Sequence, residues 1–132
     1  GGEMIVVGYT ADQYGQAALE HAMTEASVRG TGLLVVNSTK GDAYVDPAFA
    51  GAPEVHDVEV RLRNSGLAYE LTQPVGVDPV DELLTVMDRP DAELLVIGIR
   101  HRNPVGKLLL GSVSQQLLLE CQKPVLAVKP AP

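Results

Sequence analysis

Short apolar runs that recur along the chain constrain its fold more than any other feature. They predict strands over residues 4–7, 33–36, 67–72, 94–97 and 125–128. The run at 33–36 shows no polar alternation, which is typical of a strand buried on both faces of a parallel sheet. The sequence therefore favours a sheet that is covered on both sides.

Stretches with helical periodicity lie between these runs. Apolar residues three and four positions apart form four stripes: Leu19, Ala22, Met23 and Ala26; Val55, Val58 and Leu62; Val80, Leu83, Leu84 and Met87; and Val113, Leu117 and Cys121. Such spacing is typical of amphipathic helices. The alternation of strands and helices predicts an α/β fold, a doubly wound, mostly parallel sheet with helices on both faces.

One domain is expected, because the chain has 132 residues. We expect it to span residues 3–130, with Gly1 and Gly2 as a remnant of cloning. Residues 39–53 contain several Gly and Pro and keep no period, which predicts a long, mobile surface loop. The lone Cys121 is expected to be a packed thiol rather than a nucleophile.

Composition excludes several classes of partner. The formal net charge is −7, and 4% of the residues are aromatic. Nucleic acid and anionic membrane surfaces attract proteins with an excess of Lys and Arg, and single strands also need aromatic residues for stacking. No apolar stretch approaches the roughly 20 residues of a membrane span, and the first residues carry no signal-peptide pattern. We therefore expect a cytoplasmic protein that binds neither nucleic acid nor membrane.

The segment 94–113 is the strongest candidate for a ligand site. The apolar run 94–97 ends at Gly98, and Gly111 and Ser112 open the last predicted helix. The loop between them carries Arg100, His101, Arg102 and Lys107 but no acidic residue. A helix N-terminus beside cations favours an anion such as phosphate. The alternative is that the charges only keep the loop soluble.

Known phosphate-binding and catalytic patterns are missing from the sequence. The dinucleotide fingerprint is absent after Gly8, and a P-loop fails because His101 and Leu108 stand where Gly and Ser or Thr are needed. No Ser-His-Asp or Cys-His pairing and no metal-ligand spacing is apparent, and His21 and His56 are expected to be solvated. The protein is therefore predicted not to be an enzyme, apart from slow incidental ATP hydrolysis.

The last third of the chain resembles the universal stress protein family. The segments VIGIR, PVGKLLLGSVS and KPVLAVK carry the resemblance, and ATP-binding members of the family have G-x2-G-x9-G-[ST] in this place. The IVVG and LLVVNS segments fit as well, so that the resemblance covers residues 4–129. It implies a single three-layer domain with a five-stranded parallel sheet of order 3-2-1-4-5. It also implies binding of ATP or AMP, with Mg²⁺ as the metal expected beside the phosphates.

The resemblance implies a set of site residues. Gly98, Gly111, Ser112 and Val113 match the family motif, whereas His101 replaces its second glycine and Thr10 replaces an early acidic residue. Asp12 lies two residues further on and is a conceivable substitute for that acid. The residues expected to bind the nucleotide are Tyr9, Thr10, Ser38, Ile97, Gly98, Arg100, His101, Arg102, Gly111, Ser112 and Val113.

A homodimer is the expected assembly. The family layout places the run 125–128 at the edge of the sheet, where its backbone groups would be unpaired in a monomer. Pairing of this strand with its copy would cover them. The alternative function is a universal stress protein that binds no nucleotide and acts as a dimeric interaction module.

Overall fold

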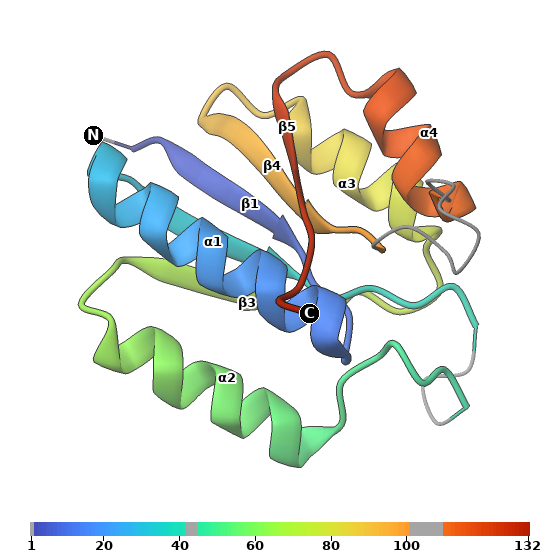
Figure 1. Cartoon of the computed structure of the whole chain (residues 1–132), viewed down its shortest axis with the longest axis horizontal. Helices are drawn as coiled ribbons and strands as arrows, with labels where there is room; N and C mark the ends of the chain where they lie inside the picture. The colour runs from blue at the N-terminus through green and yellow to red at the C-terminus, as the bar shows by residue number, and fades with distance from the viewer. Residues whose placement is uncertain (1, 42–44, 101–109) are drawn as a thin grey trace.

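Five parallel strands form one sheet in the computed structural model, which describes residues 2–41, 45–100 and 110–132 (Figure 1). The strands are β1 (Met4–Gly8), β2 (Gly32–Val36), β3 (Tyr69–Thr72), β4 (Ala92–Gly98) and β5 (Val125–Val128). Their order across the sheet is β3-β2-β1-β4-β5, and every neighbouring pair is parallel. This confirms the predicted fold class and strand order.

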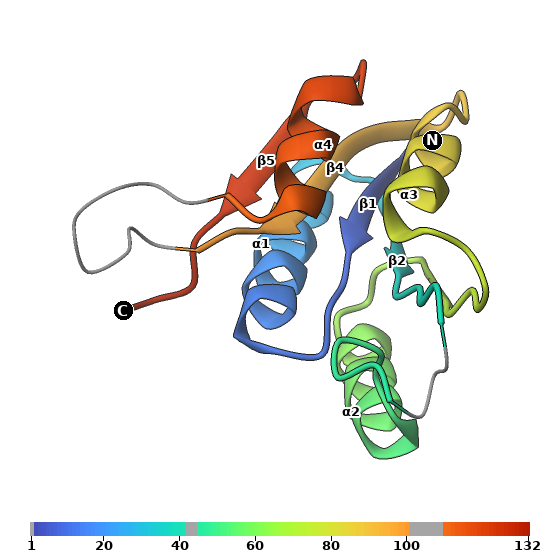
Figure 2. The ribbon, with the colours of Figure 1, turned by 90° about the vertical axis from the view of Figure 1, so that its right-hand side faces the viewer.

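Two helices pack on each face of the sheet. α1 (Gln13–Arg29) and α2 (Ala52–Asn64) contribute to one core cluster, and α3 (Pro79–Met87) and α4 (Ser112–Glu120) contribute to the other. Alternate strand residues point to opposite faces, so that Ile5 and Val7 belong to the first cluster and Val6 to the second. The strand arrows in Figure 2 point toward the end of the sheet at which α1 and α4 begin.

The structure corrects the predicted elements at three places. β3 begins at Tyr69 rather than at residue 67, because Leu67 donates its backbone N–H to Ser65 Oγ in the turn after α2 (3.1 Å). α4 ends at Glu120, so that Cys121 lies just beyond the helix, although it still packs against the second core cluster. Val113, expected on the apolar stripe of α4, is 45% exposed.

The segment 39–53 is less of a surface loop than its sequence predicts. Residues 42–44 lie outside the described part of the chain. Elsewhere in the segment Thr39 is completely buried and Ala50 is nearly so. Thr39 also forms an isolated parallel bridge with Val75, beyond the end of β3. The segment is therefore anchored at both ends, and its expected mobility stays a prediction.

Candidate functional site

A cavity of about 310 Å³ opens at the carboxyl ends of β1, β2 and β4. Gly8, Val36 and Gly98, the last residues of these strands, border it, and α3 and α4 contribute Leu83 and Leu117. The strand order reverses between β1 and β4, which is where doubly wound sheets bind ligands. The loops after β1 and β4 meet here.

Most of the predicted site residues border this cavity. Those that do are Tyr9, Thr10, Ser38, Ile97, Gly98, Arg100, Gly111 and Val113. Ser112 is the first residue of α4 and is exposed, but it is not among the described residues that line the cavity, whereas Ser114 is. His101 and Arg102 lie outside the described residues.

The helices that begin at the cavity differ in how their first N–H groups are satisfied. Asp12 caps α1 by accepting hydrogen bonds from the N–H groups of Tyr14 and Gly15, both at 3.0 Å. Asp78 caps α3 in the same way. α4 starts at Gly111 with no side-chain cap and no acidic residue in its first turn. Its N-terminus is therefore the electropositive one at this cavity.

The two glycines that match the family motif, Gly98 and Gly111, have different structural roles. A Cβ on Gly98 would lie 2.2 Å from the carbonyl oxygen of Tyr14, so this glycine allows α1 to pack on the end of β4. A Cβ on Gly111 would meet no atom of the described residues within 4 Å, and its φ of −62° is accessible to any residue. Gly98 is thus needed by the fold, whereas nothing in the described part of the chain crowds Gly111.

Thr10 and Asp12 are joined to each other. The Thr10 hydroxyl donates to Asp12 Oδ1 at 2.7 Å, and the same oxygen accepts the two capping bonds of α1. Gly15 permits this close turn, because a Cβ there would lie 1.7 Å from the Thr10 carbonyl oxygen. One carboxylate oxygen of Asp12, the residue that the sequence suggested as a substitute for the family's acid, is therefore engaged by the protein itself.

Tyr9 borders the cavity, but its side chain belongs to the opposite face of the sheet. Its ring is buried in the core cluster formed with α1 and α2, and its hydroxyl accepts a hydrogen bond from Gln16 Nε2 at 2.7 Å. Burial, followed by the negative charge of Glu54, raises the pKa of Tyr9 well above its ordinary value. Tyr9 therefore offers the cavity its backbone rather than its phenol.

Asp46 and Ala48 also line the cavity, and sequence reasoning did not single them out. They come from the segment 39–53 and are held there by Asn37, which is 2% exposed. Asn37 Nδ2 donates to the carbonyl oxygens of Tyr9 and Ala48, both at 2.9 Å. Asn37 Oδ1 accepts from the N–H of Ala50 at 2.8 Å. The only available signal was a polar residue directly after an apolar strand.

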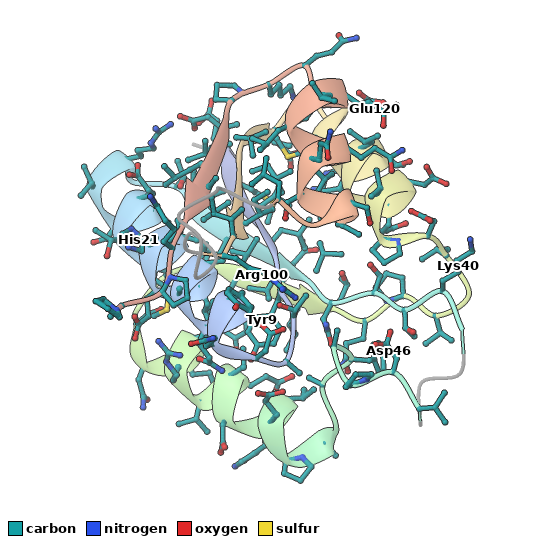
Figure 3. The ribbon with its side chains drawn as sticks, turned by 45° about the vertical axis from the view of Figure 1, so that its right-hand side comes forward. Tyr9, His21, Lys40, Asp46, Arg100 and Glu120 are labelled. Atoms are coloured by element: carbon teal, nitrogen blue, oxygen red, sulfur yellow. The ribbon has the colours of Figure 1, made fainter. Side chains whose placement is uncertain are left out.

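Charges are separated along the cavity. Arg100 follows β4, whereas Asp46 lies on the loop after β2; both border the cavity, and Figure 3 shows them apart from each other. An apolar surface lines the middle of the cavity. It is formed by Val36 at the end of β2, Ile97 near the end of β4 and Leu83 of α3. The cavity thus has an electropositive end at the start of α4 and an apolar middle, and the carboxylates of Asp12 and Asp46 also border it. Among the described residues, no group of three His, Cys, Asp or Glu side chains is placed to hold a metal ion.

Comparison with known proteins gives a consistent result. The sequence model described as "Universal stress protein family" matches residues 3–129. A protein named universal stress protein from Mycolicibacterium smegmatis is 72% identical over 127 residues, which cover 96% of this chain and 98% of that protein. The described part of the chain contains no helix with the length and apolar character needed to cross a membrane.

Solved structures with the same fold include a universal stress protein from Archaeoglobus fulgidus. It is 30% identical, with a TM-score of 0.77, and the match covers 96% of this chain and 98% of that one. An Archaeoglobus fulgidus structure in complex with dAMP has a TM-score of 0.67 at 24% identity, covering 96% of this chain and 97% of that chain. A universal stress protein in complex with cAMP has a TM-score of 0.71 at 24% identity, covering 98% of each chain. The last two likenesses concern the fold alone.

Proposed function

Because the chain belongs to the universal stress protein family, we propose that it binds an adenine nucleotide, AMP or ATP. The phosphates lie at the N-terminus of α4, and Mg²⁺ accompanies ATP through its phosphates. Binding, rather than turnover, carries the function, and any ATP hydrolysis is slow and incidental. The protein acts in the cytoplasm in a stress-response or regulatory role.

The start of α4 is the observation that carries this proposal. α1 and α3 satisfy their first N–H groups with Asp12 and Asp78, but α4 starts at Gly111 without a side-chain cap. Unpaired N–H groups and the helix dipole attract an anion, and Arg100 adds positive charge at the same end of the cavity. The apolar surface of Val36 and Ile97 then suits the flat face of a base.

Two related folds support the choice of ligand. Universal stress proteins have been solved in complex with dAMP and with cAMP. Both ligands combine adenine with a sugar and a phosphate. A cavity with an electropositive end and an apolar middle matches that combination in this chain as well.

The Gly111→Asp variant tests the phosphate site. Its backbone is already extended, so an Asp can cap α4 and occupy the N–H groups with its own negative charge. We expect a loss of affinity for AMP and ATP of at least about tenfold, while the helix gains a few tenths of a kcal/mol. Titration calorimetry measures the affinity, and thermal unfolding measures the stability.

Gly51→Asp is the matched control. Gly51 begins α2, also without a side-chain cap, and it does not border this cavity. The variant should bind both nucleotides as the wild type does. If the wild type gives neither heat nor a thermal shift at millimolar nucleotide, or if Gly111→Asp binds normally, the proposal is wrong.

We also propose a homodimer built on β5. β5 is the last strand of the sheet, and Val125, Leu126 and Ala127 are each partly exposed. α4, the helix that leads into β5, exposes Leu118 and Leu119. An apolar edge strand with an apolar neighbour favours antiparallel pairing with its copy about a two-fold axis.

Ala127→Lys tests the dimer. The added charge would lie in the proposed contact, and the variant should be a monomer with unchanged nucleotide affinity. Thr72→Lys is the control, because Thr72 is exposed on β3 at the other edge of the sheet. Light scattering at about 50 µM separates the outcomes, and a monomeric wild type would contradict the dimer.

A further inference from the structure

We propose that Asp46 recognises the exocyclic amino group of an adenine base and so favours adenine nucleotides over purine nucleotides that offer no hydrogen-bond donor at this position. This inference rests on the proposed nucleotide binding and adds the residue that sets its specificity. It starts from the separation of charge along the cavity. The carboxylate comes from a loop whose sequence gave no sign of a ligand contact.

The electrostatics fix the direction in which a nucleotide lies. The phosphate carries the negative charge and belongs at the start of α4, beside Arg100. Asp46 lies beyond β2, on the other side of β1 from β4. Two strand spacings, about 10 Å, separate β2 from β4, which is comparable to the distance from a phosphate to the far edge of its base. The base edge therefore faces Asp46.

The carboxylate of Asp46 is held in place before any ligand arrives. Its Oδ2 accepts the hydroxyl hydrogen of the buried Thr39 at 2.6 Å, and its Oδ1 accepts the N–H of Ala48 at 3.0 Å. Ala48 is fixed in turn, since its carbonyl oxygen accepts from Ala11 and from Asn37. Each carboxylate oxygen has two lone pairs and can accept a further hydrogen bond.

Other acceptors at the cavity are less suited to this role. Asp12 Oδ1 already accepts three hydrogen bonds, and Thr10 donates one of them. The hydroxyl of Ser38 borders the cavity but is neutral. A hydrogen bond to an ionised carboxylate is roughly twice as strong as one between neutral groups. We therefore assign the role to Asp46, and Asp12, the other carboxylate at the cavity, is the alternative that the experiment must separate from it.

The chemistry of a carboxylate defines what it selects. Ionised Asp46 accepts hydrogen bonds and donates none. The 6-amino group of adenine supplies a donor, whereas a purine with hydrogen at this position supplies nothing and leaves the carboxylate without a partner. The site should thus prefer AMP to purine riboside 5′-monophosphate, which has the same ribose and phosphate.

Calorimetry of these two ligands tests the inference. We expect the wild type to bind AMP about tenfold or more tightly than the analogue. In Asp46→Ala the two affinities should become equal within about twofold. In Asp46→Asn the preference should fall to a few-fold, because the isosteric amide still reaches Thr39 and Ala48 but has lost its charge. The ratio of affinities is the readout, since any general change in the loop affects both ligands alike.

Asp78→Asn is the matched control. It removes the same charge from a residue that caps α3 and does not line the cavity, so the ratio should stay at the wild-type value. Equal binding of both ligands by the wild type overturns the inference and leaves nucleotide binding intact. Loss of the preference in Asp12→Asn but not in Asp46→Asn also overturns it. Absence of binding of either ligand overturns the proposed function together with the inference.

Discussion

The two ends of the sheet satisfy their polar groups in different ways. At the amino ends of β4 and β5, Lys123 Nζ donates to the carbonyl oxygens of Arg89 and Ala92 at 2.6 and 2.7 Å, and the Arg89 guanidinium binds both carboxylate oxygens of Asp91. At the carboxyl ends, α4 begins without a side-chain cap beside a cavity. At β4 and β5 the chain closes the amino end with its own groups, whereas at the carboxyl end it leaves an open cavity.

The carboxyl end is itself divided into a filled part and an open part. Gly15 and Gly98 allow α1 to lie directly against the loop after β1 and the end of β4. Asn37 uses its full hydrogen-bonding capacity to hold the loop that contains Asp46. Only beyond these contacts does the open space begin. A ligand site of this kind therefore depends on a rigid surround as much as on the groups that touch the ligand.

The largest expected effect is a difference in stability between two glycine variants, one in the filled part and one in the open part of the carboxyl end. Gly98→Ala would place a Cβ against the carbonyl group of Tyr14, which belongs to backbone and cannot move aside easily. We expect a loss of roughly 3 kcal/mol in the free energy of unfolding, at the upper end of overpacking costs. Gly111→Ala, with none of the described residues near its Cβ, should cost less than about 1 kcal/mol. Urea denaturation of both variants measures the contrast, and equal losses would erase it.

The next largest loss of stability is expected when the side-chain amide of Asn37 is removed. Asn37→Ala leaves the buried N–H of Ala50 without its acceptor and releases two carbonyl oxygens, so that about 2 kcal/mol of stability should be lost. Gln73→Ala is the comparison, because Gln73 is half-buried and bonds to the same loop at Ala50. It should cost clearly less in the same urea experiment. A larger loss for Gln73→Ala would show that Asn37 is not the main anchor.

A smaller effect is expected at the closed end. Lys123→Met keeps the aliphatic part of the side chain and removes the ammonium group that joins the start of β5 to the turn before β4. We expect a loss of about 1 to 2 kcal/mol in the free energy of unfolding. Lys129→Met, on an exposed residue, should have almost no effect. Nucleotide affinity should be unchanged in both variants, because neither residue borders the cavity.

The smallest effect concerns pH. The hydrogen bonds and positive charge of Arg89 hold the pKa of Asp91 below its ordinary value of 3.8. The folded state therefore gains stability above that value and loses it as the pH falls through the lowered pKa. Both side chains are partly exposed, so the gain is small. Unfolding midpoints at pH 5 and pH 3 should differ slightly less in Asp91→Asn than in the wild type, and an unchanged difference would rule out this contribution.

Much of the fold was predictable, because its signals are local and periodic. The apolar runs at 4–7 and 33–36 and the stripe from Leu19 to Ala26 located strands and a helix, and the family resemblance supplied the strand order. The observed bounds of an element differ from the predicted ones where a single hydrogen bond determines where the element starts, as at Leu67. These shifts did not alter the topology.

The site was predictable only in part. Gly98 and Gly111 were found from the motif, but their different surroundings depend on α1, which is remote in sequence. Asp46 was missed because its place at the cavity depends on Asn37 and Thr39, and contacts between side chains of this kind leave no period in the sequence. A residue such as Gly15 inside a helix was the one hint of close packing nearby.

The complete bonding of Asn37 has a kinetic consequence. Because the wall formed by Asp46 and Ala48 is already in place, a ligand need not order this loop when it arrives. The association rate should then be set by diffusion and by attraction toward the start of α4, and it should fall as salt screens that attraction. Differences in affinity among related nucleotides would accordingly arise from differences in their dissociation rates.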